Sequence, residues 1–326
     1  MKIMHIDQNH ANQRIDKYLK KLLCRAPSSF IYKMIRKKDV KVNGVRVKEN
    51  YILKEGDEVS LFLYEDKFLE YTQPQTIYDL KITFDVLYED TNILIVNKPA
   101  GLLVHEDMNE SLNTLSNQVL TYLYQKGEYD PESSLGFTPG PVHRLDRNTS
   151  GIVIFGKTMN ALQDLNEMMK QRHCIEKTYL TICQGLMPSC ELIHYMKKES
   201  DQSLVKIVSK ETPGALKMHT IVKNIKNNQH YSLLEVQLVT GRTHQIRVHL
   251  ASQGHPIIGD SKYGDFELNK HIKKRYHLQH QFLHAYKIYF KRTIGSLKYL
   301  QDKTIISPMP SSLLKIKREV FDENQL

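Results

Sequence analysis

The sequence predicts an α+β protein: a large domain with a mixed, mainly antiparallel sheet follows a small N-terminal α/β domain. Two observations support this prediction. Apolar residues recur at helical and then at strand spacing over residues 15–63, and from Lys81 onward short β-rich runs dominate without internal repeats. The mixed composition of residues 64–80, which include Pro74, indicates a connection. We therefore expect domains over residues 1–66 and 81–326, joined by a linker over residues 67–80.

Charge is unevenly distributed along the 326 residues, of which 40% are hydrophobic and 25% charged. Lys and Arg outnumber Asp and Glu by 46 to 36, a net charge of +10. Residues 14–54 hold 13 basic and 3 acidic residues, so the remaining chain carries 33 of each sign. The sequence therefore predicts a basic module attached to a neutral body, and a polyanion as its partner.

The composition also argues against several protein classes. No apolar run reaches the roughly 20 residues that span a bilayer, and the N-terminus lacks the apolar stretch of a secretory signal. The four cysteines form no CxxC pair and fit the reduced thiols of a cytoplasmic protein. Because there is also no glycine-rich phosphate loop, we expect a cytoplasmic monomer that uses no nucleotide or other cofactor and has no membrane partner.

The N-terminal module contains two predicted helices and a hairpin. Apolar residues recur at helical spacing over residues 15–23, and Ser28 or Ser29 can cap a second helix. Asn43-Gly44 between alternating valines predicts a two-residue hairpin, and a strand over residues 58–63 follows. The cations gather on the second helix and the hairpin. Taken alone, they fit a solvated charged face about as well as a phosphate-binding face.

Residues 13–62, QRIDKYLKKLLCRAPSSFIYKMIRKKDVKVNGVRVKENYILKEGDEVSLF, resemble the S4 RNA-binding domain. The resemblance implies that the helix and hairpin hold structured RNA through its phosphates and its shape. The residues that it assigns to RNA binding are Arg14, Lys33, Arg36, Lys37, Lys38, Lys41 and Arg46.

The larger body reads as a series of strands with few helices. We expect helices over residues 159–169 and 243–252, the second capped by Thr243 and followed by Gly254. Strands are expected over residues 82–88, 93–97, 151–155, 178–183, 218–225, 231–239 and 282–290.

The first segment with candidate chemistry is HRLDRNTSG, residues 143–151, directly before a predicted strand. Its Asp146 lies between two arginines, which favour the carboxylate form. Taken alone, such a loop is more often a salt bridge than a catalytic site. The residue types also suggest a serine hydrolase, but the Gly-x-Ser-x-Gly elbow is missing.

Two further segments stand out. Alternation puts Lys177 and Tyr179 on one face of a strand, which alone indicates ordinary cross-strand packing. GRTHQIRVHL, residues 241–250, places Arg247 near the helix side that carries His244, which alone suits a solvated face. We expect no metal site, because no Cys or carboxylate completes the loosely spaced histidines at positions 277, 280 and 284.

Together, HRLDRNTSGIVIF, KTYLTICQG and LVTGRTHQIRVHLASQGHPIIGDSKYG resemble the RluA family of pseudouridine synthases. LYEDTNILIVNKPAGLLVH (87–105) and FLHAYKIYF (282–290) extend the resemblance over residues 84–314. With the S4-like module in front, the arrangement is similar to the branch of the family that modifies large-subunit ribosomal RNA.

The resemblance also implies roles for single residues. Asp146 matches the catalytic aspartate, Tyr179 the active-site tyrosine and Arg247 the basic partner of the aspartate. Arg144 matches the arginine that helps to displace the target base. The remaining residues that we assign to the RNA substrate are His143, Arg242 and His244. The sequence departs from the family at Asn148, where an acidic residue is frequent, and at His280, where arginine is frequent.

The implied reaction cuts the bond from uridine N1 to the ribose and rejoins the ribose through C5. Asp146 would attack the base or sugar covalently, or take a ribose proton, and the residues leave both routes open. Tyr179 would lie against the uracil and help to remove the C5 proton, once the uridine has been flipped out of its helix. Two alternatives remain: the same chemistry on other ribosomal sites or transfer RNA, and a non-catalytic RNA-binding or ribosome-assembly protein.

Overall fold

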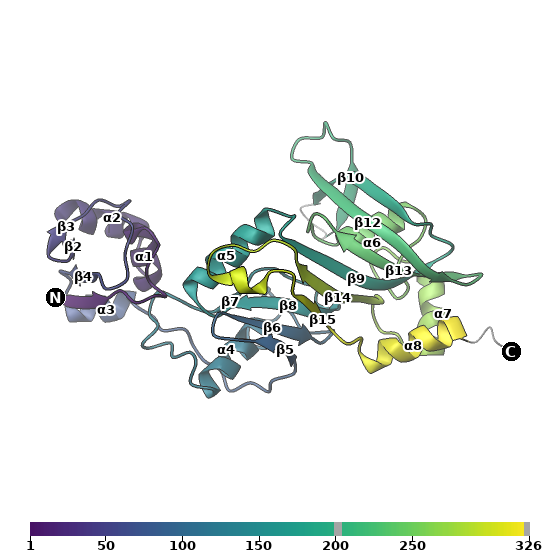
Figure 1. Ribbon diagram of the computed structural model, residues 1–326, viewed down its shortest axis with the longest axis horizontal. Helices are drawn as coiled ribbons and strands as arrows, with labels where there is room; N and C mark the ends of the chain where they lie inside the picture. The colour runs from purple at the N-terminus through teal and green to yellow at the C-terminus, as the bar shows by residue number, and fades with distance from the viewer. Residues whose placement is uncertain (199–203, 323–326) are drawn as a thin grey trace.

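The computed structural model describes residues 1–198 and 204–322. Figure 1 shows a small N-terminal domain at one end of the molecule and a larger domain built around one long sheet. This is the α+β architecture that the sequence predicts, and the sheet is mixed and mainly antiparallel, as expected.

The N-terminal domain builds one apolar core from two helices and a four-stranded sheet. Its helices are α1 (Ile15–Leu22) and α2 (Ser28–Lys37). Its strands, in the order β1-β4-β2-β3, are β1 (Lys2–His5), β2 (Val40–Val42), β3 (Val45–Arg46) and β4 (Glu58–Leu61). The predicted helices and hairpin are confirmed, and Asn43 and Gly44 have the positive φ angles (+50° and +77°) of a type I′ turn.

Helix α2 does not begin with the serine cap that we expected. Its N-cap is Pro27, and no side chain accepts a hydrogen bond there. Ser28 is already the first helical residue, because Pro27 (φ −57°) leads the chain directly into the first turn.

A third helix, α3 (Glu65–Tyr71), occupies the start of the expected linker. Its Phe68 is buried in the N-terminal core, and the backbone N–H of Arg25 donates to the carbonyl of Tyr71 (3.1 Å). The expected boundary at residue 66 therefore falls inside α3, and the segment without helix or strand covers residues 72–84. The charged residues of this segment form the exposed side of the two-turn helix.

The large sheet follows the order β11-β10-β12-β13-β9-β14-β8-β6-β5, with β15 paired to β14 and β7 to β8. Every pairing is antiparallel except that of β14 with β8. The strands are β5 (Asp85–Glu89), β6 (Ile93–Lys98), β7 (Gly140–Pro141), β8 (Ser150–Gly156), β9 (Ile175–Gln184), β10 (Cys190–Lys198), β11 (Val205–Val208), β12 (Leu216–Asn227), β13 (Tyr231–Leu238), β14 (Leu283–Phe290) and β15 (Thr304–Ile306).

Helices cover both faces of the central strands. On β8, Ile152 and Ile154 face the cluster that includes α5, whereas Val153 and Phe155 face the cluster that includes α4 and α6. This double burial explains why β6 and β8 are continuous apolar runs rather than alternating ones. The helices of this domain are α4 (Leu115–Gln125), α5 (Met159–Lys170), α6 (Gln245–Ser252), α7 (Phe266–Tyr276), the 3₁₀ helix η1 (Gly295–Leu300) and α8 (Ser311–Asp322).

Helix α6 also lacks its predicted cap. It begins at Gln245, its N-cap is His244 in the left-handed region (φ +53°), and no side chain caps it. The Gln245 side chain organises the preceding turn instead, because its amide oxygen accepts from the Arg242 N–H (3.1 Å) and the Thr240 hydroxyl (2.7 Å).

A small set of contacts joins the two domains. His10 is buried, with Nε2 2.7 Å from the carbonyl oxygen of Leu135 and Nδ1 2.6 Å from the Asp7 carboxylate. The Asn9 side-chain oxygen accepts the N–H of Met159 at the start of α5 (3.2 Å). The N-terminal domain therefore rests against α5 and the loop before β7.

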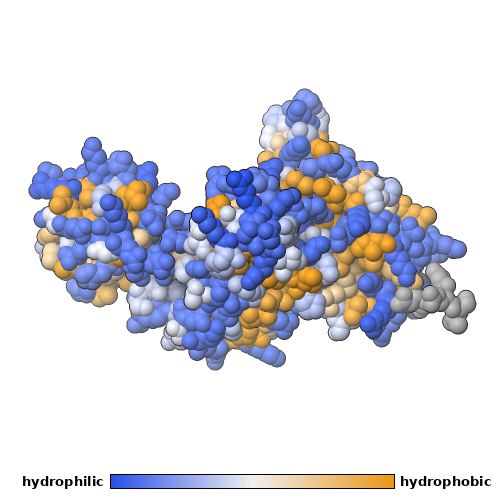
Figure 2. All heavy atoms as spheres, in the orientation of Figure 1, coloured by the Kyte–Doolittle hydropathy of each residue, from blue (hydrophilic) through white to orange (hydrophobic). Residues whose placement is uncertain are grey.

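The surface is mostly polar, with apolar side chains gathered over the region of β10, β12 and β13 on the face shown in Figure 2. Exposed residues of these strands include Ile193, Leu216 and Ile221. None of the helices in residues 1–198 and 204–322 is long and apolar enough to cross a bilayer.

Candidate functional site

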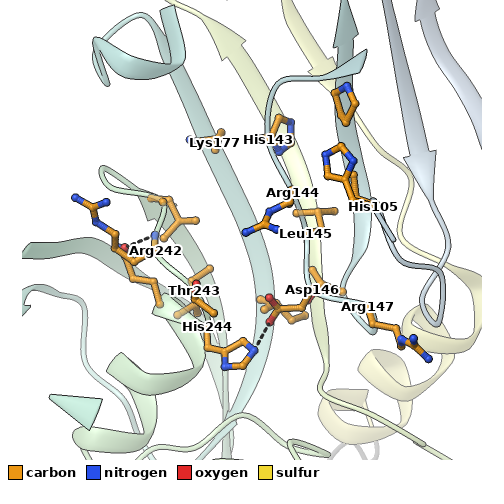
Figure 3. Close-up of a pocket in the computed structure, with 18 of the residues that line it drawn as sticks. His105, His143, Arg144, Leu145, Asp146, Arg147, Lys177, Arg242, Thr243 and His244 are labelled. Atoms are coloured by element: carbon orange, nitrogen blue, oxygen red, sulfur yellow. Dashed lines mark hydrogen bonds and ion pairs between the residues drawn. The ribbon is translucent and has the colours of Figure 1, made fainter. Parts of the chain in front are cut away.

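A cleft of about 620 Å³ opens above the middle of the large sheet, where loops from several strands meet. The turn between β7 and β8 brings Asp146, strand β9 brings Tyr179, and the start of α6 brings Arg247. Figure 3 shows side chains from these elements converging on one space. The three residues that the sequence singled out for chemistry therefore share one cavity.

Asp146 lies in a turn that is held by hydrogen bonds from Lys98 and the loop after β6. The carbonyl of the next residue, Arg147, accepts hydrogen bonds from the Lys98 ammonium (2.9 Å) and the Gly101 N–H (2.9 Å). Lys98 is fully buried and also donates to the carbonyls of Pro99 (2.8 Å) and Leu102 (2.7 Å). Burial lowers the pKa of Lys98 to about 7, and the negative charge of Asp146 acts in the opposite direction. One ammonium thus ties the loop after β6 to the loop that carries Asp146.

Arg247 is held between two carboxylates. Its Nε and Nη2 donate to the two oxygens of Asp260 (2.7 and 2.8 Å), and its Nη1 donates to Oδ2 of Asp146 (2.9 Å). Arg247 and Asp260 have side chains only 5% and 1% exposed, whereas 27% of Asp146 is exposed toward the cleft. The bidentate pair fixes the guanidinium, so that its remaining N–H points at Asp146. Arg247 is therefore not on a solvated helix face.

His244 and Tyr263 complete this side of the cleft. His244 Nε2 is 3.9 Å from Asp146 Oδ2, and His244 Nδ1 is 2.9 Å from the Tyr263 hydroxyl. The Tyr263 ring lies against the Arg247 guanidinium, with Cζ 5.3 Å from the ring centroid. Burial lowers the pKa of His244, while the charge of Asp146 raises it. His244 is thus a polar neighbour of the carboxylate, and Arg247 is its firm partner.

Tyr179 forms part of the apolar floor of the cleft and is 6% exposed. Burial raises the pKa of its phenol above the usual value, and the nearby Asp146 charge raises it further. The phenol is therefore protonated at neutral pH. Such a group packs against a flat ring and donates a hydrogen bond, and the expected help of Tyr179 in removing the C5 proton stays a prediction.

The other predicted substrate residues line the same cleft. Arg144 is exposed and reaches into the cleft, as Figure 3 shows, and Arg242 holds the carbonyl of Lys217 with its Nε (3.3 Å). His143 Nε2 accepts the N–H of Ile154 (3.3 Å), and burial lowers its pKa to about 3. His143 is therefore a neutral wall residue.

The predicted RNA-binding residues of the N-terminal domain differ in whether their charged groups are exposed and able to contact RNA. Arg14 is engaged by the carboxylate of Asp16 through two hydrogen bonds of 3.0 Å. Lys41 is partly buried, with its ammonium 5.0 Å from the centroid of the Phe62 ring. The others are exposed on α2 and the adjoining hairpin: Lys33, Arg36, Lys37, Lys38 and Arg46.

Sequence reasoning missed Lys98, Asp260 and Tyr263. Lys98 and Asp260 lie inside the segments that carry the family resemblance, but nothing in their spacing shows that they contact the Asp146 loop or Arg247. The sequence offered one signal, for Lys98: a lysine directly at the end of an apolar run. Among residues 1–198 and 204–322, no group of three or more His, Cys, Asp or Glu side chains could hold a metal ion.

Comparisons with known proteins identify the family of the chain. Residues 92–252 match the RNA pseudouridylate synthase family, and residues 13–59 match the S4 domain. An uncharacterized RNA pseudouridine synthase of Mycoplasma genitalium is 33% identical over 88% of this chain and 88% of its own length. A ribosomal large subunit pseudouridine synthase C of Buchnera aphidicola is also 33% identical, with 88% of each chain covered.

Among solved structures, human RNA pseudouridylate synthase domain containing 4 has a TM-score of 0.57 at 20% identity, covering 72% of this chain and 92% of its own. The fold is thus that of a pseudouridine synthase with an S4 domain in front. The chain belongs to the RNA pseudouridine synthase family and isomerises uridine in RNA. The alternative of a non-catalytic protein is not retained.

Proposed function

We propose that the substrate is large-subunit ribosomal RNA and that Asp146 is the catalytic carboxylate. The substrate is supported by the relative from Buchnera aphidicola, whose name specifies the ribosomal large subunit, and by the exposed cations of α2 and the hairpin. These cations suit the phosphates of structured RNA. The enzyme would act in the cytoplasm, where ribosomes assemble, and as a monomer, which light scattering can check.

The single observation that carries the catalytic assignment is the Asp146–Arg247–Asp260 arrangement. It presents a partly exposed carboxylate oxygen to the cleft while a buried guanidinium fixes its partner oxygen. An ionised, oriented carboxylate is what attack on the base or sugar requires, and it is equally what abstraction of a ribose proton requires. Asp260 binds Nε and Nη2 of Arg247 on the other side of the guanidinium. Arg247 therefore orients Asp146 without leaving a buried charge unpaired.

The other cleft residues would hold the everted uridine. Flipping a nucleotide out of a helix costs a few kcal/mol of stacking and pairing. Arg144 would fill the vacated position in the stack, and the cations of the N-terminal domain would offset the cost through phosphate contacts. Tyr179 would pack against the uracil and donate a hydrogen bond to it, so that the detached base stays in place for rejoining through C5.

The catalytic assignment is tested with Asp146→Asn. Ribosomal RNA labelled with tritium at uridine C5 releases the label when pseudouridine forms. We expect Asp146→Asn to abolish release and to keep the affinity for RNA, because the amide preserves shape and removes only the charge. Asp302→Asn, an exposed carboxylate that accepts from Tyr289, is the matched control and keeps full activity. Full release by Asp146→Asn would refute the assignment.

The substrate is tested by mapping pseudouridines in ribosomal and transfer RNA from cells with and without the gene. We expect the loss of pseudouridines in the large-subunit RNA alone. Loss confined to transfer RNA or to the small subunit would contradict the proposed substrate and leave the catalytic assignment untouched.

A further inference from the structure

The Lys177 side chain lines the cleft but has no role in the proposed reaction. Lys177 lies on β9 two positions before Tyr179, so both side chains are on one face of the strand, and both line the cleft. Figure 3 shows Lys177 beside His143, at the end of the cleft opposite His244. The reacting group Asp146 lies beside His244, away from Lys177 (Figure 3).

The surroundings of Lys177 supply no negative charge. Its ammonium is 3.9 Å from the sulfur of Met169, and no carboxylate lies within ion-pair distance of it among residues 1–198 and 204–322. The adjacent His143 is neutral, since its Nε2 accepts a backbone hydrogen bond. Burial and the positive charge of Arg172 both lower the pKa of Lys177. A partly buried ammonium without a counter-ion is costly, and an anionic ligand removes that cost.

The same end of the cleft holds two further cations, the guanidinium groups of Arg144 and Arg242. Three acidic residues line the cleft: Asp146 is bound to Arg247, Asp107 pairs with Arg147 (3.5 Å), and Glu106 adjoins Asp107 in the loop after β6. The cleft is therefore divided into a carboxylate end and a cationic end, which is the arrangement that a nucleotide with one reacting sugar and one flanking phosphate would fill.

We propose that Lys177 binds the phosphate that joins the target uridine to its neighbouring nucleotide. Two residues along a strand span about 6.6 Å, so Lys177 reaches roughly one backbone step beyond the nucleoside that Tyr179 contacts. The opposite wall is Gly241, where an added Cβ would lie 3.8 Å from the Lys177 nitrogen, so the missing side chain leaves the approach open. An ammonium suits a phosphate as a point charge. The proposal rests on the proposed function.

This contact would set which phosphate enters the cleft and thereby fix the register of the RNA strand against Asp146. Phosphate contacts position a nucleic acid without reading its bases. Lys177 is thus a substrate-binding residue whose loss weakens binding, rather than a group that takes part in bond breaking.

The test compares Lys177→Met with Lys177→Arg, using ribosomal RNA labelled at uridine C5. We expect Lys177→Met to raise KM at least about tenfold, as loss of a charge-assisted hydrogen bond predicts, and to change kcat by less than about threefold. In an Asp146→Asn background, its RNA affinity should depend less steeply on salt, with a slope smaller by about 0.7–0.9. Lys177→Arg should recover most of the affinity. Lys170→Met, an exposed lysine at the end of α5, is the control and should match the wild type.

Unchanged KM and salt slope in Lys177→Met overturn the proposal, as does a fall in kcat with unchanged KM and a shifted pH profile, which would indicate proton transfer instead. Thermal unfolding checks that each variant folds, and Lys177→Gln takes the place of Lys177→Met should that variant not fold. The outcomes separate the two hypotheses: if the wild type releases no tritium from ribosomal RNA, the proposed function fails, whereas an active wild type with an unaffected Lys177→Met removes only this phosphate site.

Discussion

Asp260→Asn tests whether the orientation of Arg247 controls the reaction. The substitution keeps the volume of a side chain that is 1% exposed but removes one of the two charges that neutralise Arg247. The new amide group must turn an N–H toward the guanidinium or toward the backbone N–H groups of Lys262 and Tyr263, which the Asp260 carboxylate now accepts. Removing one partner of a buried ion pair costs about 3–5 kcal/mol of unfolding free energy.

The kinetic effect follows from the same geometry. With one of its N–H groups left without an acceptor, Arg247 no longer holds Asp146 firmly, and a misplacement of about 1 Å at a reacting group lowers the rate about 100-fold. Asp260 does not line the cleft, so we expect KM to change by less than about threefold. Tritium release measures kcat and KM, thermal unfolding measures stability, and Asp302→Asn is again the control. A wild-type kcat in Asp260→Asn would refute the view that Asp260 positions Arg247.

Two predictions concern other parts of the molecule. His249 of α6 is fully buried beside His194, and burial together with the charges of His194 and His219 lowers its pKa from 6.5 to about 4. The unfolded chain therefore binds the extra proton first, and stability falls by about 3 kcal/mol as pH drops from about 6.5 to 4. Urea unfolding across this range should show a shallower decline for His249→Asn, and parallel curves would contradict the prediction. On α2, Arg36→Ala with Lys37→Ala should weaken RNA binding and lower its salt slope by about 0.7–0.9 per lost phosphate contact, at unchanged kcat with saturating RNA. Filter binding at several salt concentrations measures the slope, and an unchanged slope would exclude α2 from the RNA interface.

Strong local patterns were sufficient to predict much of the fold. The apolar runs of β6 and β8 and the Asn43-Gly44 turn each specify one local structure, and all three are present. In contrast, α7 was missed because Ile272 is its single buried residue, so it has no apolar stripe to detect. Strand β10 was missed for a related reason: much of it is exposed, and Leu192 and Met196 alone are fully buried.

The site was predicted less completely than the strands. Asp146, Tyr179 and Arg247 meet in one cleft, as the family resemblance implied, but their catalytic roles remain predictions. Asp260 could not be found from the sequence, because its contact with Arg247 depends on the path of the chain after α6. The role expected of Tyr179 in proton removal likewise stays a prediction, and the burial that raises the pKa of its phenol is visible only in the fold.

The position of β14 between β8 and β9 sets an order in which the enzyme can mature. During synthesis, the N-terminal domain has all its strands and helices once α3 has emerged. Strands β8 and β9, which adjoin Asp146 and carry Tyr179, cannot pair with β14 until it has been synthesised, about a hundred residues after the end of β9. We therefore expect a nascent chain to complete its S4 domain before its catalytic cleft, so that cleft assembly is the late stage of its folding.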